Sequence, residues 1–254
     1  MNTNALPIAV FDSGVGGISV LRELVRLMPQ ENFLYFGDSA NAPYGTKDVL
    51  QVRQLTLDAA EVLLQRGIKA LVVACNTATS AAINALREKY PDLVVIGIEP
   101  ALKVAADRFP TGNIGVMATP VTLREEKFSM QAERFPCIHL ERIPAPGLVE
   151  LIEHGERDSL ETQLLLEQLL APYAGKLDAL VLGCTHYPFV SRLIGKILGP
   201  GTVLLDGGAG TAKQTRRCLE EAGLLWDGPG SVQIENSNAD PALLQLSMKL
   251  LQED

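Results

Sequence analysis

Short apolar segments of strand length alternate with longer amphipathic segments along most of the chain, and this alternation limits the possible folds more than any other feature. The first apolar segments are PIAVFDS, NFLYFGDS, ALVVAC and LVVIGI, and each is followed by a helical pattern. Strands that alternate with helices form βαβ units, which build a parallel sheet with buried central strands. The sequence therefore predicts an α/β fold in which helices flank parallel sheets.

A second series of the same kind starts near NIGVMAT and continues through CIHLERIPAP, SLETQLLLEQLLAPY, ALVLGCTHYP and TVLLDGG. Because the two series are similar, we expect two pseudo-symmetric domains, each with a parallel-sheet α/β sandwich. The first domain is expected to comprise residues 1–98 and 208–254, and the second residues 99–207.

The connection between the predicted domains and the C-terminal segment carry weaker signals. Pro100 follows an apolar run and opens a helical pattern, which indicates a hinge at residues 98–100. A last amphipathic helix begins at Pro241. We expect the C-terminal segment, which also contains Trp226, to pack back on the first domain.

Size, charge and apolar content exclude several classes of protein. With 254 residues, 47% of them hydrophobic, the chain can bury one large core or two modest ones. The net charge of −8 disfavours nucleic acid as a partner, because phosphate contacts rely on clustered Lys and Arg. No apolar run approaches the ~20 residues that span a bilayer, and the first residues lack the pattern of a secretory signal. We expect a cytoplasmic protein that binds neither nucleic acid nor membrane.

The positions of the cysteines favour reactive thiols over disulfide bonds. The four cysteines are scattered and form no CxxC motif, so neither a zinc site nor a disulfide framework is expected. Cys75 in ALVVACNTATS and Cys184 in ALVLGCTHYP occupy matched positions, because each ends an apolar run and precedes hydroxyl and amide side chains.

These two positions favour reactive thiols over buried apolar ones, which are the common alternative. The carboxyl edge of an open α/β sheet binds ligands, and a helix N-terminus favours the thiolate form of a cysteine there. His186, two residues after Cys184, can share the proton of that thiol. Two acid/base groups that face each other across a cleft between domains are the arrangement needed to invert a carbon centre.

Two other loops follow predicted strands. FDSGVGGIS either binds phosphate or turns sharply and presents Asp12 and Ser13 at the sheet edge, although Asp12 also suits an ordinary helix N-cap. YFGDSANAPYGTK brings Asp38 and Tyr44 to the same edge, but its composition is also typical of ordinary loops. Glu150 opens a helix, where the helix dipole favours a carboxylate, whereas Glu153 and His154 are interpreted as a solvated helix face.

In this order, the motifs DSGVGG, GDSANAPYG, ACNTATS and LGCTHYP resemble those of the glutamate racemases, a cofactor-independent family of aspartate and glutamate racemases. The resemblance covers nearly the whole chain. It implies two α/β domains with the active site in the cleft between them, a homodimer, and interconversion of L- and D-glutamate for peptidoglycan synthesis. It also implies that neither pyridoxal phosphate nor a metal is required.

The resemblance further implies roles for residues that match the family's motifs. Cys75 and Cys184 are expected to be the two catalytic bases, toward D-glutamate and L-glutamate respectively. Asp12 is expected to support Cys75. His186, helped by Glu150, is expected to support Cys184. The expected substrate contacts are Asp12, Ser13, Tyr44, Gly45, Asn76, Thr77, Thr185 and His186.

One segment departs from the family pattern, and other functions remain open. ATPVTL has Pro120 and Val121 where a smaller turn is expected, so Thr119 and Thr122 receive no role. A racemase of the same fold for aspartate or another amino acid is one alternative. A cysteine-dependent acyl transferase or hydrolase that uses Cys184 and leaves Cys75 idle is a second, and a small-molecule binding protein is a third.

Overall fold

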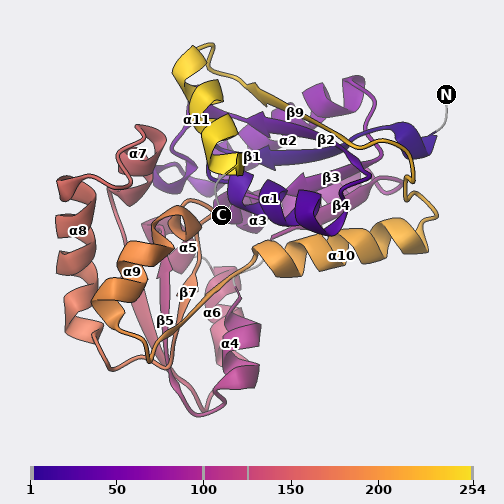
Figure 1. Cartoon of the computed structure of the whole chain (residues 1–254). Coiled ribbons are helices and arrows are strands. Elements are labelled where there is room, and N and C mark those ends of the chain that lie inside the picture. Colours follow the sequence, from indigo (N-terminus) through magenta and orange to yellow (C-terminus); the bar gives the residue numbers. More distant parts are fainter. Residues whose placement is uncertain (1–2, 99–100, 125, 253–254) are drawn as a thin grey trace. The chain divides into compact units, whose positions relative to one another are not determined.

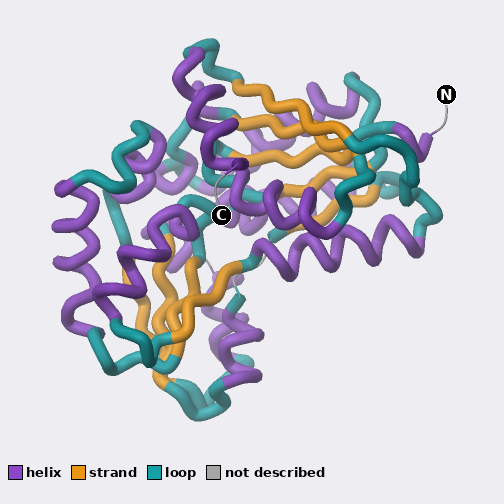
Figure 2. The backbone as a smooth tube through the Cα atoms, viewed as in Figure 1, coloured by secondary structure: helices purple, strands orange, loops and turns teal. Residues whose placement is uncertain are grey.

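The computed structural model describes residues 3–98, 101–124 and 126–252, which form two parallel sheets flanked by helices (Figures 1 and 2). The predicted α/β class is therefore confirmed. The chain divides into two compact units, Met1–Glu99 with Gly208–Asp254 and Pro100–Gly207. Most of the predicted hinge at residues 98–100 lies outside the described residues.

The first unit is built on a five-stranded parallel sheet with the order β4-β3-β1-β2-β9. Its strands are β1 (Ile8–Asp12), β2 (Asn32–Gly37), β3 (Ala70–Val73), β4 (Val94–Gly97) and β9 (Ser231–Asn236). Its helices are α1 (Ile18–Leu27), α2 (Val49–Gln65), α3 (Asn76–Lys89), α10 (Gly208–Glu221) and α11 (Pro241–Gln252). Helix α1 packs against α10 and α11, whereas α2 packs against α3.

The second unit contains a four-stranded parallel sheet with the order β6-β5-β7-β8. Its strands are β5 (Asn113–Ala118), β6 (His139–Pro144), β7 (Ala179–Leu182) and β8 (Val203–Asp206). Its helices are α4 (Leu102–Arg108), α5 (Pro120–Arg124), α6 (Glu126–Glu133), α7 (Leu148–Glu153), α8 (Leu160–Leu170) and α9 (Ser191–Leu198).

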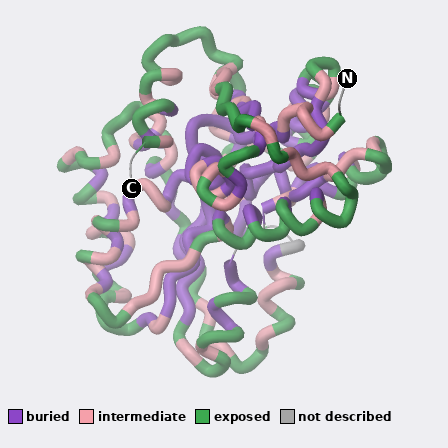
Figure 3. Tube along the Cα trace, turned by 45° about the vertical axis from the view of Figure 1, so that its right-hand side comes forward, coloured by how far each residue is buried: buried purple, intermediate pink, exposed green. Residues whose placement is uncertain are grey.

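Alternate residues of the central strands enter separate cores, because successive side chains of a strand point to opposite faces. In β7, Leu180 and Leu182 join the cluster that contains Ile152 of α7. Ala179 and Val181 join a second cluster, which contains Leu102 of α4. Nearly all residues of β1, β3, β5 and β7 are buried, and Figure 3 shows exposed residues along the outer turns of the chain. Within the described residues, no helix has both the length and the apolar character of a membrane span.

Strand β9 is not among the predicted elements. Its sequence SVQIEN places apolar Val232 and Ile234 between polar residues, and this alternation is the signal of a half-buried edge strand. It pairs in parallel with β2 and closes one edge of the first sheet. A strand so exposed carries too little apolar content to stand out in the sequence.

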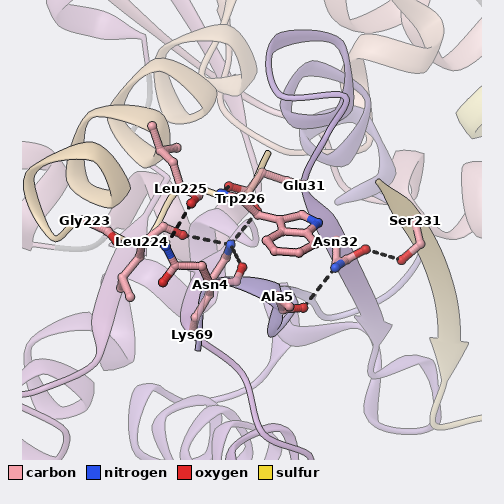
Figure 4. Close-up of polar contacts among 10 residues, drawn as sticks. All are labelled: Asn4, Ala5, Glu31, Asn32, Lys69, Gly223, Leu224, Leu225, Trp226 and Ser231. Atoms are coloured by element: carbon pink, nitrogen blue, oxygen red, sulfur yellow. Dashed lines mark hydrogen bonds and ion pairs between the residues drawn. The ribbon is translucent and has the colours of Figure 1, made fainter. Parts of the chain in front are cut away.

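Within the first unit, a buried ion pair fastens the C-terminal segment to the N-terminal part of the chain (Figure 4). Lys69 pairs with Glu31, and their side chains are only 0% and 2% exposed. Lys69 Nζ also donates to the carbonyl oxygens of Asn4 (2.6 Å) and Leu224 (2.9 Å). Glu31 Oε1 accepts a hydrogen bond of 2.9 Å from the backbone N–H of Trp226. These additional hydrogen bonds offset the cost of burying the two charges.

We predict that Lys69→Met lowers the free energy of unfolding by about 3 to 5 kcal/mol, because it leaves the carboxylate of Glu31 buried without its cation. Urea denaturation measures the effect. The matched control is Lys89→Met, which breaks the exposed pair with Glu61 and should leave the transition almost unchanged. Equal shifts for the two variants would contradict the role given to the buried pair.

Candidate functional site

Polar residues gather at the carboxyl edge of the first sheet, and we call this set the Cys75 region. β1 ends at Asp12, and β3, its neighbour in the sheet, ends two residues before Cys75. Ser13 Oγ lies 3.5 Å from Cys75 Sγ. The sulfur also accepts a hydrogen bond of 3.4 Å from the backbone N–H of Ala78, which makes Cys75 the N-cap of α3. The thiol therefore lies at the positive end of a helix dipole, which stabilises negative charge.

The role of Gly17 in the loop after β1 differs from the sharp backbone turn that the sequence predicts. Gly17 has a φ of −63°, which any residue adopts, so no sharp turn requires a glycine there. A Cβ at Gly17 would instead lie 2.6 Å from the Cβ of Asp12 and 3.1 Å from the ring of Tyr35. Glycine is needed because the helix start packs directly on Asp12, which is fully buried and accepts a 3.0 Å hydrogen bond from the Gly14 N–H.

Tyr44 belongs to the same region, as predicted, and its side chain is buried. Its hydroxyl donates to Asp38 Oδ2 at 2.7 Å. Burial, the hydrogen bond to Asp38 and the negative charges of Asp38, Cys75 and Asp12 together raise the pKa of Tyr44 far above its ordinary value. Tyr44 therefore remains a neutral hydrogen-bond donor at physiological pH.

The first turn of α3 presents further polar groups. Asn76, Thr77 and Thr79 are all buried, and Thr79 Oγ1 donates to the carbonyl oxygen of Val73 at 3.0 Å. Asn76 Oδ1 is buried without a hydrogen-bond partner among the described residues. An unsatisfied buried acceptor costs about 1–3 kcal/mol, so this oxygen is suited to receive a donor from a ligand.

The second sheet has an equivalent group of residues, the Cys184 region, at the carboxyl end of β7. Cys184 Sγ lies 3.6 Å from His186 Nδ1, and His186 Nε2 lies 2.6 Å from Glu153 Oε1. Cys184 and His186 are buried, and the side chain of Glu153 is only 13% exposed. A thiol, an imidazole and a carboxylate thus form a continuous array.

The two neighbours of His186 determine its charge. Burial alone would lower the pKa of His186, but the hydrogen bonds to Cys184 and Glu153, together with their negative charges, raise it well above its ordinary value. The imidazolium form is therefore favoured. The imidazolium places a positive charge 3.6 Å from Cys184 Sγ.

The carboxylate in this array is not the one that the sequence indicated. The interpretation of Glu153 as part of a solvated helix face is wrong, because it closes the array at the end of α7. The described residues contain no hydrogen bond between Glu150 and His186. Glu150 instead lines a groove of about 850 Å³ with His154 and residues of α8. Its charge acts on Tyr187, whose pKa is raised by burial and by the negative charges of Cys184 and Glu150.

Two residues that received no role from the sequence also lie at this sheet edge. Thr119 and Thr122 follow β5, the neighbour of β7, and both are buried. Their hydroxyl oxygens are 3.0 Å apart. Thr185, a predicted substrate contact, is buried directly after Cys184. Within the described chain, no group of three or more His, Cys, Asp or Glu side chains is arranged to hold a metal ion.

We predict that Glu153→Gln lowers the pKa of His186, because it removes a carboxylate that favours the imidazolium. The titration can be followed by NMR of ring-labelled histidine, with the exposed His139 and His154 as internal references.

The same variant tests the pH dependence of stability. A histidine whose pKa rises on folding stabilises the protein below about pH 6.5, and the stabilisation disappears as the pH rises through the folded-state pKa. The stability gap between wild type and Glu153→Gln should therefore be larger at acidic than at alkaline pH. An unchanged His186 titration would contradict the assigned array.

Comparison with known proteins agrees with this geometry. The sequence model of the Asp/Glu/hydantoin racemase family matches residues 8–215. A glutamate racemase from Clostridium botulinum (strain Alaska E43 / Type E3) is 48% identical over 256 residues, which cover 99% of each chain.

Solved structures give the same result. The glutamate racemase from Thermus thermophilus, in complex with beta-chloro-D-alanine, has a TM-score of 0.84 and 39% identity, covering 98% of this chain and 94% of that one. The glutamate racemase from Francisella tularensis, in complex with D-glutamate, has a TM-score of 0.86 and 29% identity, covering 99% and 95%. The chain therefore belongs to the Asp/Glu/hydantoin racemase family, and the relatives compared with it above are glutamate racemases.

Proposed function

We propose that this chain interconverts L- and D-glutamate and that Cys75 and Cys184 act as two bases on opposite faces of the substrate α-carbon. One observation carries the mechanism: each unit holds a buried thiol at a strand end, with its own hydrogen-bond partners. The glutamate racemases among the relatives, one of them solved with D-glutamate, support the choice of substrate.

In the proposed reaction, the Cys184 thiolate removes the α-proton of L-glutamate. The C–H bond breaks, an S–H bond forms on Cys184, and the electron pair remains on the substrate as a carbanion. The Cys75 thiol then delivers its proton to the opposite face and becomes a thiolate. D-glutamate reacts in reverse, with Cys75 as the base.

The carbanion is the difficult species, because the α-proton of an amino acid is a very weak acid. Preorganised donors in a site with little water stabilise such charge. The proposed donors are Ser13, Thr77 and Thr185, together with backbone N–H groups of the first turn of α3. Asn76 Oδ1 is proposed to accept from the substrate ammonium group, since it is a buried acceptor beside Cys75 that has no partner among the described residues.

The two thiols are proposed to be supported differently. Beside Cys184, the imidazolium of His186, held by Glu153, stabilises the thiolate. Beside Cys75, the hydroxyl of Ser13 and the Ala78 N–H provide hydrogen bonds, while Asp12 supports the same sheet edge.

A second function has one specific observation in its favour. Cys184, His186 and Glu153 form a nucleophile, base and orienting carboxylate, which is the arrangement of cysteine hydrolases and acyl transferases. That chemistry would need Cys184 but not Cys75. A racemase specific for aspartate would need both thiols, so it differs from the main proposal only in substrate preference.

The biological setting is also a proposal, based on the family resemblance. We propose that the enzyme works in the cytoplasm as a homodimer and supplies D-glutamate for peptidoglycan and thus for cell-wall biogenesis. Sedimentation velocity tests the dimer, which should have twice the 27.4 kDa mass of the chain. A single species at the monomer mass would contradict it.

We predict that the purified protein, without added cofactor, causes L-glutamate in deuterated water to lose optical rotation and gain α-deuterium. Cys75→Ala and Cys184→Ala should each reduce racemisation by about 100-fold or more, because each removes an acid/base group. The control is Cys137→Ala, which removes an exposed thiol and should have no effect.

The outcomes separate the candidate functions. No loss of rotation by the wild type would refute the racemase. A hydrolytic or acyl-transfer activity that is lost in Cys184→Ala but kept in Cys75→Ala would favour the cysteine hydrolase or acyl transferase. Faster racemisation of L-aspartate than of L-glutamate would identify aspartate as the preferred substrate.

A further inference from the structure

The segment between β2 and α2 lies at the carboxyl edge of the first sheet and is held from a distant part of the chain. It contains two short 3-10 turns, Ser39–Asn41 and Tyr44–Thr46. Tyr44 and Gly45 are assigned to substrate binding under the proposed function. What fixes their position is therefore relevant to how the enzyme binds its substrate.

Tyr44 is anchored at both ends of its side chain. Its ring is 1% exposed and packs against Phe11 of β1, with ring centroids 6.3 Å apart. Its hydroxyl is held by Asp38 Oδ2 at 2.7 Å. Among the described residues, Asp38 is the hydrogen-bond partner of this hydroxyl, so the position of Asp38 fixes the hydroxyl end of Tyr44.

Asp38 is itself held by its neighbours. Asn41 Nδ2 donates to both carboxylate oxygens, at 3.0 and 3.1 Å. The backbone N–H of Asp38 donates to the carbonyl oxygen of Asp12 at 2.9 Å, which connects it to the end of β1. The turn that carries Asn41 is thus the support for the Asp38 carboxylate.

That turn is attached to the end of β9. Asn236 Nδ2 donates to Ser39 Oγ at 2.9 Å, and the Ala40 N–H donates to Ser237 Oγ at 3.0 Å. The Ser237 N–H donates to the carbonyl oxygen of Gly37 at 2.9 Å. Asn236 Oδ1 accepts from the Asn238 N–H, which orients its amide toward Ser39. Two hydrogen bonds therefore join the C-terminal segment to the turn, and a third joins it to the end of β2.

We propose that Asn236 and Ser237 are positioning residues that hold the Ser39–Asn41 turn, and through Asp38 fix Tyr44 and Gly45 for substrate binding. The proposal rests on the proposed function, because the substrate contact of Tyr44 and Gly45 belongs to it. Among the described residues, no hydrogen bond of the Asn236 or Ser237 side chain leads to Cys75. Their loss should thus affect substrate binding more than proton transfer.

The test compares two double variants on one strand. Asn236→Ala/Ser237→Ala removes the side-chain hydrogen bonds to the turn. Ser231→Ala/Gln233→Ala is the matched control at the other end of β9, where Ser231 bonds to Asn32 (Figure 4) and Gln233 bonds to Glu235. We expect the KM for glutamate to rise by about 10-fold in the first variant, with kcat changed much less. The control variant should keep both constants.

Amide hydrogen exchange of residues 38–46, measured by mass spectrometry, gives a readout independent of activity. Exchange should accelerate in Asn236→Ala/Ser237→Ala and stay at the wild-type rate in the control. Ser237→Thr keeps a hydroxyl at position 237. With Asn236 unchanged, this variant should keep slow exchange and a low KM. Unchanged exchange in the first variant would overturn the attachment of the turn, whatever the activity.

A coupling experiment tests the route through Asp38. Asp38→Ala should raise KM, and its combination with Asn236→Ala/Ser237→Ala should raise KM by less than the product of the separate effects, because all three residues act on one turn. Faster exchange with an unchanged KM, or fully multiplicative effects, would overturn the positioning role. If the wild type does not racemise glutamate, the proposed function fails, and exchange alone decides whether β9 holds the turn.

Discussion

Neighbouring parallel strands end at the same edge of their sheet, and the positions of both thiols depend on that constraint. Asp12 ends β1, Asp38 follows β2 and Cys75 follows β3, so three residues that are far apart in the chain lie at the ends of adjacent strands. Where such a strand gives way to a helix, the N–H groups of the first turn are free to bind a thiol or a ligand. Cys75, which accepts the Ala78 N–H, uses this property directly.

The same constraint operates in the second unit, but the groups around its thiol differ. Cys184 is followed by a short 3-10 helix, Tyr187–Val190, and its partner is the imidazole of His186. Cys75 has a hydroxyl and a backbone N–H as neighbours. In the proposed reaction each thiol is the base toward one enantiomer and the acid toward the other. Because their neighbours differ, the thiolate of Cys184 can be stabilised for the reaction of L-glutamate and the thiolate of Cys75 for the reaction of D-glutamate.

The sequence was informative about strand ends and much less so about contacts between helices. Apolar runs that stop at Asp12, Cys75 and Cys184 predicted the parallel sheets and the position of these residues at their edges. Glu153 was missed because Glu150 and Glu153 are both carboxylates on one short helix, and only the packing of α7 decides which one reaches His186. The helix-dipole argument favoured Glu150 for a local reason that the tertiary contact overrides.

Two further features depend on contacts across long sequence separations. Gly17 is explained by its close approach to Asp12 and Tyr35 rather than by a turn, and the sequence alone contains no sign of that approach. Strand β9 joins the first sheet only because the chain returns to it after α10, where the buried pair of Lys69 and Glu31 holds the connecting segment. The Ser39–Asn41 turn is thus held by a residue nearly 200 positions away in the sequence.

The most direct test of two opposed bases is the distribution of deuterium between the two enantiomers at early times. L-Glutamate is incubated with the protein in deuterated water, the reaction is stopped after a few per cent conversion, and the enantiomers are separated and analysed by mass spectrometry. Two bases on opposite faces predict that the D-glutamate is fully α-deuterated while the remaining L-glutamate keeps its proton. Deuterium entering both pools at equal rates would contradict the mechanism, because it would mean that one base serves both faces.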